Sequence, residues 1–252
     1  MLHDFRRLKF PSDSTGYTYD LKVYVPDSEE PSAGFPVYYI LDGLSYFQFA
    51  KDVVRLQSRN TLKTGVSPGA VIGICHAEQD MRQRRFFDFT APALDYAYPD
   101  RLKGRDCGPH GGAKDFICFL EQELMPFIGN MVNVDRQRQT LFGHSLGGYF
   151  SLYALFTKPN LFNTYLACSP SIWWNRYELF GYADTFISQS AIVPRIQITV
   201  GEKEGFMVED AVQMEQRLRE TGRDIGFFIA PEENHASIVP TIMSRAIRFA
   251  DN

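Results

Sequence analysis

One serine in this chain lies in a pattern that is typical of a nucleophile. Gly143, Ser145 and Gly147 fit G-x-S-x-G, a pattern that also arises by chance in a chain with 19 glycines. Its context is more specific, because an apolar strand over 139–142 precedes it and a helical pattern over 148–156 follows it. We therefore expect Ser145 on a sharp strand-to-helix turn, where the glycines let backbone pass closely and the helix N-terminus favours negative charge. The alternative is an ordinary tight turn with a capping serine.

A serine hydroxyl needs a base to take its proton. Of five histidines, His235 is the best placed, because it follows a predicted strand at 225–230 and precedes the last predicted helix. This position matches the chain order serine, acid, histidine of α/β-hydrolases. His110 lies in a loop that follows no strand, and His144 lies inside the turn itself, so we do not expect either to act as the base. The alternative for His235 is a loop residue at the start of a helix.

The base in turn needs a carboxylate, which should follow the penultimate strand, predicted at 195–200. Glu204 is the first choice there and Glu202 is its close competitor, whereas Asp210 lies too far into the next helix. Such a carboxylate holds the imidazole tautomer and stabilises its charged form. If both glutamates are solvated loop charges, the site works as a serine–histidine pair.

An oxyanion hole takes one N–H group from the residue after the nucleophile, here Leu146. The second comes from the loop after an early strand, and the strand at 37–41 is followed by such a loop. We favour the Leu44 N–H as this second donor, with Gly43 as the alternative.

Basic and aromatic side chains are interleaved between residues 82 and 105. Six bases and three acids give this segment a local excess of +3 on an acidic chain. The bases are Arg82, Arg84, Arg85, Arg101, Lys103 and Arg105. Trp173 and Trp174, the two tryptophans of the chain, follow another predicted strand end. Arginine beside aromatic rings suits a flat, anionic ligand, although solvated arginines and buried tryptophans are the common alternative.

Strands that alternate with helices must position these residues. Apolar runs predict buried strands at 37–41, 70–75, 139–142, 164–169, 195–200 and 225–230. Helical patterns at 113–128 and 208–221 lie between these strands, and a further one at 236–250 follows the last strand. This alternation predicts an α/β fold with a mostly parallel central sheet and helices on both faces.

The remaining segments refine this picture. Residues 5–10 and 17–25 predict an opening hairpin. Residues 76–111 and 170–193 do not fit the alternation, and we expect both to overhang the carboxyl edge of the sheet, where ligands gather. We expect a single domain over residues 1–252.

Composition narrows the classes of protein further. The formal charge of −4 and a pI near 5.8 give no indication of a nucleic-acid or membrane partner. The four cysteines form no metal-binding spacing, so we expect reduced thiols and neither metal nor cofactor. The first residues have no apolar core of a signal peptide, and a cytoplasmic location is the default expectation.

The chain resembles the α/β-hydrolase esterases that cut trilactone siderophores, the enterobactin and bacillibactin esterase group within the esterase D-like set. Two stretches are particular to this branch, R-x-x-D-[FY]-T-x-P beginning at Arg85 and S-P-S-x-W-W over 169–174. The G-x-S-x-G turn at Ser145 and the Asn234–His235 segment are shared with many esterases. The resemblance covers most of the chain and matches the shorter members, without an extra N-terminal domain.

The resemblance implies Ser145 as nucleophile, His235 as base, and Arg85 with Trp173 or Trp174 near a catecholate pocket. The expected activity is hydrolysis of an ester or lactone through an acyl-enzyme, with a free or ferric catecholate trilactone as the preferred substrate. A general carboxylesterase or an S-acylglutathione thioesterase is the alternative within enzymes. A siderophore-binding module without activity is the alternative outside them.

Overall fold

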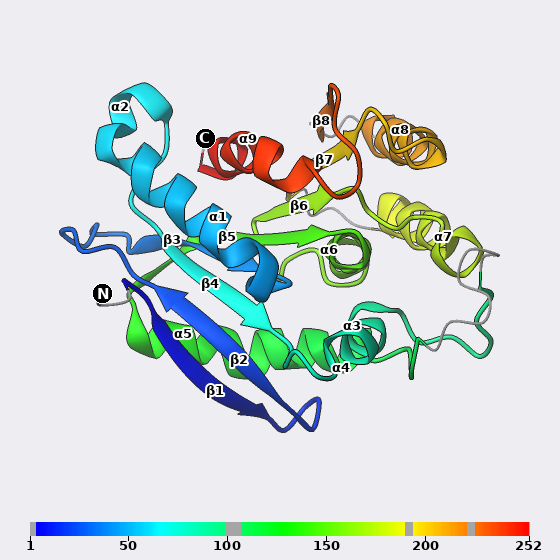
Figure 1. Cartoon of the computed structure of the whole chain (residues 1–252), viewed down its shortest axis with the longest axis horizontal. Helices are drawn as coiled ribbons and strands as arrows, with labels where there is room; N and C mark the ends of the chain where they lie inside the picture. The colour runs from blue at the N-terminus through cyan, green and yellow to red at the C-terminus, as the bar shows by residue number, and fades with distance from the viewer. Residues whose placement is uncertain (1–3, 99–106, 190–193, 221–224, 252) are drawn as a thin grey trace.

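The computed structural model describes residues 4–98, 107–189, 194–220 and 225–251 (Figure 1). All its described strands form one eight-stranded sheet in the order β1-β2-β4-β3-β5-β6-β7-β8. The strands are β1 Arg6–Ser12, β2 Tyr17–Tyr24, β3 Phe35–Ile40, β4 Ala70–Cys75, β5 Val134–His144, β6 Thr164–Cys168, β7 Arg195–Gly201 and β8 Ile225–Ala230. β1 and β2 form the predicted antiparallel hairpin, and the six strands from β4 to β8 in this order run parallel.

The helices lie on both faces of the sheet. They are α1 Gly43–Gln57, α2 Thr61–Thr64, α3 Met81–Phe89, α4 Ala113–Cys118, α5 Met125–Met131, α6 Leu146–Thr157, α7 Trp174–Gln189, α8 Phe206–Arg219 and α9 Ile238–Asp251. A short 3₁₀ turn, η1 Ser58–Asn60, follows α1, and a π-helical stretch, η3 Phe119–Leu124, joins α4 to α5. Figure 1 shows α1 beside α9 on one face of the sheet.

The two cores follow from the alternation of side chains along buried strands. In β3, Val37 and Tyr39 belong to the core beneath α4 to α8, whereas Tyr38 and Ile40 belong to the core beneath α1 and α9. Because both sets are buried, this strand is apolar throughout, as its sequence predicted. The mostly parallel α/β fold is therefore confirmed.

Some elements differ from the sequence interpretation. β5 begins at Val134, ahead of the strand predicted at 139–142. The sequence did not indicate the first half of β5 because its residues are polar and more exposed. Helix α1 was not predicted, although Phe47, Ala50 and Val54 recur at helical spacing and are buried. The overhanging segment 76–111 contains α3, and 170–193 contains α7. Within the described part of the chain, no helix has the length and apolar character needed to span a bilayer.

Candidate active site

Ser145 lies on the turn between β5 and α6 with φ 59° and ψ −116°. A positive φ is strained for a residue other than glycine, and this geometry is that of a nucleophile elbow. A Cβ atom at position 143 would lie 2.1 Å from the carbonyl oxygen of Gly147. At position 148 it would lie 2.8 Å from the carbonyl oxygen of Cys168. The elbow therefore needs glycine at 143 and 148 because backbone passes so close.

The structure brings the three predicted polar residues together. His235 Nε2 lies 2.9 Å from Ser145 Oγ, and His235 Nδ1 lies 2.6 Å from Glu204 Oε2. The three residues follow β5, β7 and β8, whose carboxyl ends share one edge of the sheet. With the Nδ1 proton donated to Glu204, Nε2 is left to accept the proton of the serine hydroxyl.

Glu204, rather than Glu202, contacts the histidine. Its side chain is fully buried, while Glu202 is exposed and accepts a hydrogen bond from the N–H of Glu232. Burial raises the pKa of Glu204, but hydrogen bonds from His235, Ser169 and the Gly201 N–H lower it further, so the net pKa lies below its usual value. The carboxylate is therefore ionised at neutral pH, as the stabilisation of an imidazolium requires.

His144 is buried beside this arrangement. Its ring centroid lies 4.6 Å from that of His235, and its Nδ1 lies 2.9 Å from Tyr46 Oη. Burial, and next the charge of a protonated His235, lower the pKa of His144 to about 4. His144 is therefore neutral at neutral pH.

The two expected oxyanion donors stand at the starts of helices. Leu146 opens α6 directly after the nucleophile, and Leu44 lies in the first turn of α1. The N–H groups of Ser45 and Tyr46 donate to the carbonyl of Asp42, whereas helix geometry offers no acceptor to the Leu44 N–H. A small cavity of about 220 Å³ joins this start of α1 to Ser145.

A larger cavity of about 860 Å³ opens beside the same serine. It is lined by Met81, Arg82, Arg85, Phe86, Ser145, Leu146, Ser171, Trp173, Lys203, Glu204, Phe206, Met207, Asn234, His235 and Ala236. Phe206 and Met207 were not considered from the sequence. They follow the acid at the carboxyl end of β7, and that position was the signal that could have identified them.

The two neighbouring arginines point to different surroundings. Arg85 lines the cavity and binds Asp42 through two hydrogen bonds, of 2.5 and 2.9 Å. Arg84 binds the buried carboxylate of Asp88 at 2.7 Å and stacks over the ring of Tyr17, so it serves the fold and does not line the cavity. Residues that are adjacent in a helix project about 100° apart, which separates their roles. Arg101, Lys103 and Arg105 lie outside the described residues.

The two tryptophans also separate. Trp173 lines the cavity, whereas Trp174 is fully buried and does not. The ring of Trp174 stacks on His110, with centroids 5.3 Å apart, and packs against Phe86 and Tyr98. His110 therefore belongs to an aromatic cluster that supports the wall of the cavity.

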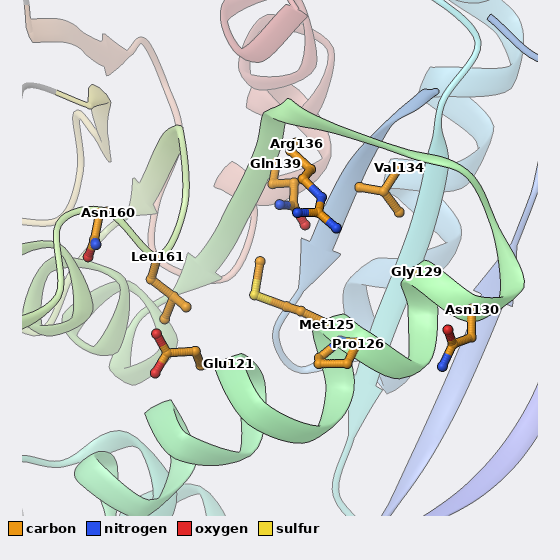
Figure 2. A pocket seen from close by; sticks show the side chains of 10 residues that line it. All are labelled: Glu121, Met125, Pro126, Gly129, Asn130, Val134, Arg136, Gln139, Asn160 and Leu161. Atoms are coloured by element: carbon orange, nitrogen blue, oxygen red, sulfur yellow. The ribbon is translucent and has the colours of Figure 1, made fainter. Parts of the chain in front are cut away.

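A second cavity, of about 500 Å³, lies at the opposite end of the parallel strands (Figure 2). The side chain of Met125 on α5 reaches toward Arg136 and Gln139 of β5, near the start of the parallel pairing. Its lining combines apolar, amide and charged groups without a serine or histidine. This smaller cavity therefore lacks the serine and histidine side chains that line the larger one.

A serine hydrolase with an α/β-hydrolase fold is the class that this fold and this site define. Residues 12–230 match the model of a family described as "Putative esterase". The chain is 38% identical to the ferri-bacillibactin esterase BesA of Bacillus subtilis, over 92% of this chain and 84% of that protein. It is 36% identical to a siderophore enterobactin esterase of Emericella nidulans, over 73% of this chain and 63% of that protein.

Solved structures agree with this assignment. The BES protein of Bacillus cereus superposes with a TM-score of 0.91 at 34% identity, over 99% of this chain and 97% of that one. The siderophore hydrolase EstA of Aspergillus nidulans gives a TM-score of 0.87 at 27% identity, over 100% of this chain and 95% of that one. The chain belongs to this esterase family, and it is a serine esterase.

Proposed function

We propose that this esterase hydrolyses the ester bonds of a catecholate trilactone siderophore, and that the iron-loaded form is a substrate. The supporting observation is the hydrogen-bonded chain Ser145–His235–Glu204 beside a cavity that combines aromatic walls with Arg82, Arg85 and Lys203. Catecholate rings stack on aromatic side chains, and a ferric tris-catecholate is an anion that arginine and lysine attract. Hydrolysis of the lactone would break up the chelator and so weaken its hold on iron.

The proposed mechanism proceeds through an acyl-enzyme. Ser145 Oγ attacks the ester carbonyl carbon while its proton passes to His235 Nε2, and the Leu146 and Leu44 N–H groups receive the oxyanion. Collapse of this intermediate breaks the bond to the leaving alkoxide, which takes the proton from His235. Water, deprotonated by His235, then attacks the acyl carbon and releases the carboxylic acid and the free serine. Glu204 stabilises the imidazolium in both halves.

Substrate preference tests the proposal. We expect kcat/KM for enterobactin-type and bacillibactin-type trilactones to exceed that for small p-nitrophenyl esters by at least about a hundredfold, because the cavity walls contact the larger substrate. A preference for the small esters or for S-acylglutathione would replace the siderophore with the corresponding substrate.

The nucleophile is tested separately. Ser145→Ala should lower kcat by at least about a thousandfold, and mass mapping should find an organophosphonate label on Ser145 in the wild type. Hydrolysis that persists in Ser145→Ala would overturn the nucleophile assignment. Unchanged siderophore affinity in that variant, with no turnover by the wild type, would show a binding module instead.

We also propose a cytoplasmic location. The four cysteines, Cys75, Cys107, Cys118 and Cys168, are free thiols. Free thiols persist in a reducing compartment. Fractionation of cells that express the protein would test this location.

A further inference from the structure

The end of β6 and the segment that leads to α7 form hydrogen bonds with the backbone of Ser145. The Ser145 N–H donates to the carbonyl of Cys168 at 2.9 Å, and the Ser171 N–H donates to the carbonyl of Ser145 at 3.0 Å. Ser171 Oγ also lies 3.4 Å from Ser145 Oγ. Both backbone groups of the nucleophile are therefore bound to this one segment.

Ser169, in the middle of the same segment, reaches the acid. Its N–H donates to the carbonyl of Thr199 on β7 at 2.7 Å, and its hydroxyl donates to Glu204 Oε1 at 2.6 Å. The Gly201 N–H donates to the same oxygen at 2.7 Å. Oε2 is thereby left to accept from His235, so the two carboxylate oxygens have separate partners.

The backbone of Ser169 is strained. It has φ 44°, its side chain is fully buried, and it precedes Pro170. Glycine adopts such a φ at lower cost, but glycine has no hydroxyl. Strain of this kind is retained where a side chain is needed at that position, and here the side chain ends on Glu204.

We propose that Ser169 is a positioning residue of the esterase, whose hydroxyl fixes the Glu204 carboxylate so that Oε2 faces His235 Nδ1. A charge-assisted O–H to carboxylate bond is short and directional, which suits this task. Residues 168–171 then contact two members of the triad, the Ser145 backbone on one side and the Glu204 carboxylate on the other, and reach His235 only through Glu204. The proposal rests on the proposed role of Glu204.

The test measures p-nitrophenyl butyrate hydrolysis, which does not depend on the identity of the natural substrate. We expect Ser169→Ala to lower kcat roughly tenfold or more, because a hydrogen bond to a charged group is lost, with KM nearly unchanged. In a Glu204→Gln background, the same change should alter kcat by less than about twofold, because Ser169 acts through that carboxylate.

Two further variants separate positioning from folding. Ser169→Gly should lose activity as Ser169→Ala does. It should nevertheless unfold at a higher temperature than Ser169→Ala, because glycine relieves the strain of the positive φ. Ser151→Ala is the matched control, since Ser151 is also fully buried and donates only to the Gly147 carbonyl. It should keep wild-type activity.

Each contrary result has a distinct meaning. Full activity in Ser169→Ala beside an impaired Glu204→Gln would overturn the role of Ser169 alone. An equal loss from Ser169→Ala in both backgrounds would do the same, since it would show a structural effect. Full activity in Glu204→Gln would overturn both the acid and its positioning residue, while Ser145→Ala would still report on the esterase mechanism.

Discussion

At the scale of single residues, burial and hydrogen bonding decide which charges the site uses. Glu204 is buried and stays ionised because three donors hold it, whereas Glu202 remains in solvent. His235 is partly exposed toward the cavity, while the adjacent His144 is buried and neutral. Burial therefore keeps the His144 imidazole neutral, and His235 is the one of these two histidines that lines the cavity.

The two glutamates give a direct prediction. Glu204→Gln should lower kcat by roughly a thousandfold or more, because an amide cannot stabilise the imidazolium as a carboxylate does. Glu202→Gln is the matched change two residues earlier in the same loop, and we expect it to keep at least half of the wild-type kcat. Steady-state rates on p-nitrophenyl butyrate at neutral pH compare them. Equal activity in both variants would favour a serine–histidine pair.

His144 gives a prediction about pH and stability. Its pKa falls from 6.5 to about 4 on folding, so between these values the unfolded chain binds more protons than the folded one. Stability therefore rises with pH across this window, and His144 should account for a loss of about 2 kcal/mol between pH 7 and pH 5. Urea unfolding of the wild type and His144→Gln at both pH values would measure this. The same pH dependence in both proteins would contradict the assignment.

At the scale of elements, the strand–turn–helix unit of β5 and α6 shows why a short motif can encode a site. Gly143, Gly147 and Gly148 lie around Ser145, but they differ in how much space a Cβ atom would have. A Cβ at 143 would strike backbone at 2.1 Å, while a Cβ at 147 would meet Asp42 Oδ2 at 3.4 Å, an ordinary contact. The second glycine of G-x-S-x-G is therefore not sterically required in this chain.

This difference can be tested with a pair of alanine variants. Gly143→Ala should destabilise the fold by more than about 3 kcal/mol, because the strand and helix must separate. Gly147→Ala should change stability by less than about 1 kcal/mol, since alanine is a good helix former at the start of α6. Thermal unfolding and organophosphonate labelling of Ser145 would compare them. Similar losses in both variants would show that the elbow tolerates no Cβ at either position.

At the scale of the whole molecule, the sheet brings Ser145, Glu204 and His235 to one edge. The net charge of the chain is negative. The chain carries −4, yet Arg82, Arg85 and Lys203 line the cavity beside Ser145. Arg85 is bound to Asp42, and Lys203 pairs with Glu232 in solvent. The Arg85–Asp42 pair is largely buried, whereas exposed pairs such as Lys203–Glu232 are weak. Arg82 and Lys203 are therefore the lining cations best placed to attract an anionic substrate.

Ionic strength should affect kcat/KM for an anionic substrate. Raising the ionic strength from about 0.01 M to about 0.15 M should lower kcat/KM for a ferric catecholate severalfold, because salt screens the attraction. The neutral p-nitrophenyl butyrate should show no such change. Arg82→Gln should reduce the salt dependence for the anionic substrate and leave the neutral ester unaffected. A salt response that is equal for both substrates would argue against electrostatic attraction at the cavity.

Chain order was sufficient to predict that Ser145, Glu204 and His235 lie close together. The sequence places Ser145, Glu204 and His235 after apolar runs that become β5, β7 and β8, and parallel strands bring their carboxyl ends to one edge whatever the packing details. Buried strands are recognisable from sequence because both of their faces must be apolar. The first half of β5 lacked this signal, since its residues are polar.

The tertiary structure decided which of two adjacent residues serves the site. Arg84 and Arg85 are alike in type and context, as are Trp173 and Trp174, and only the orientation of α3 and of the β6–α7 segment assigns one of each to the cavity. The contact of Ser169 with Glu204 depends in the same way on two strand ends lying side by side. The positions of buried strands along the chain can be recognised from local sequence, whereas the direction of a side chain at an element's end depends on neighbours distant in sequence.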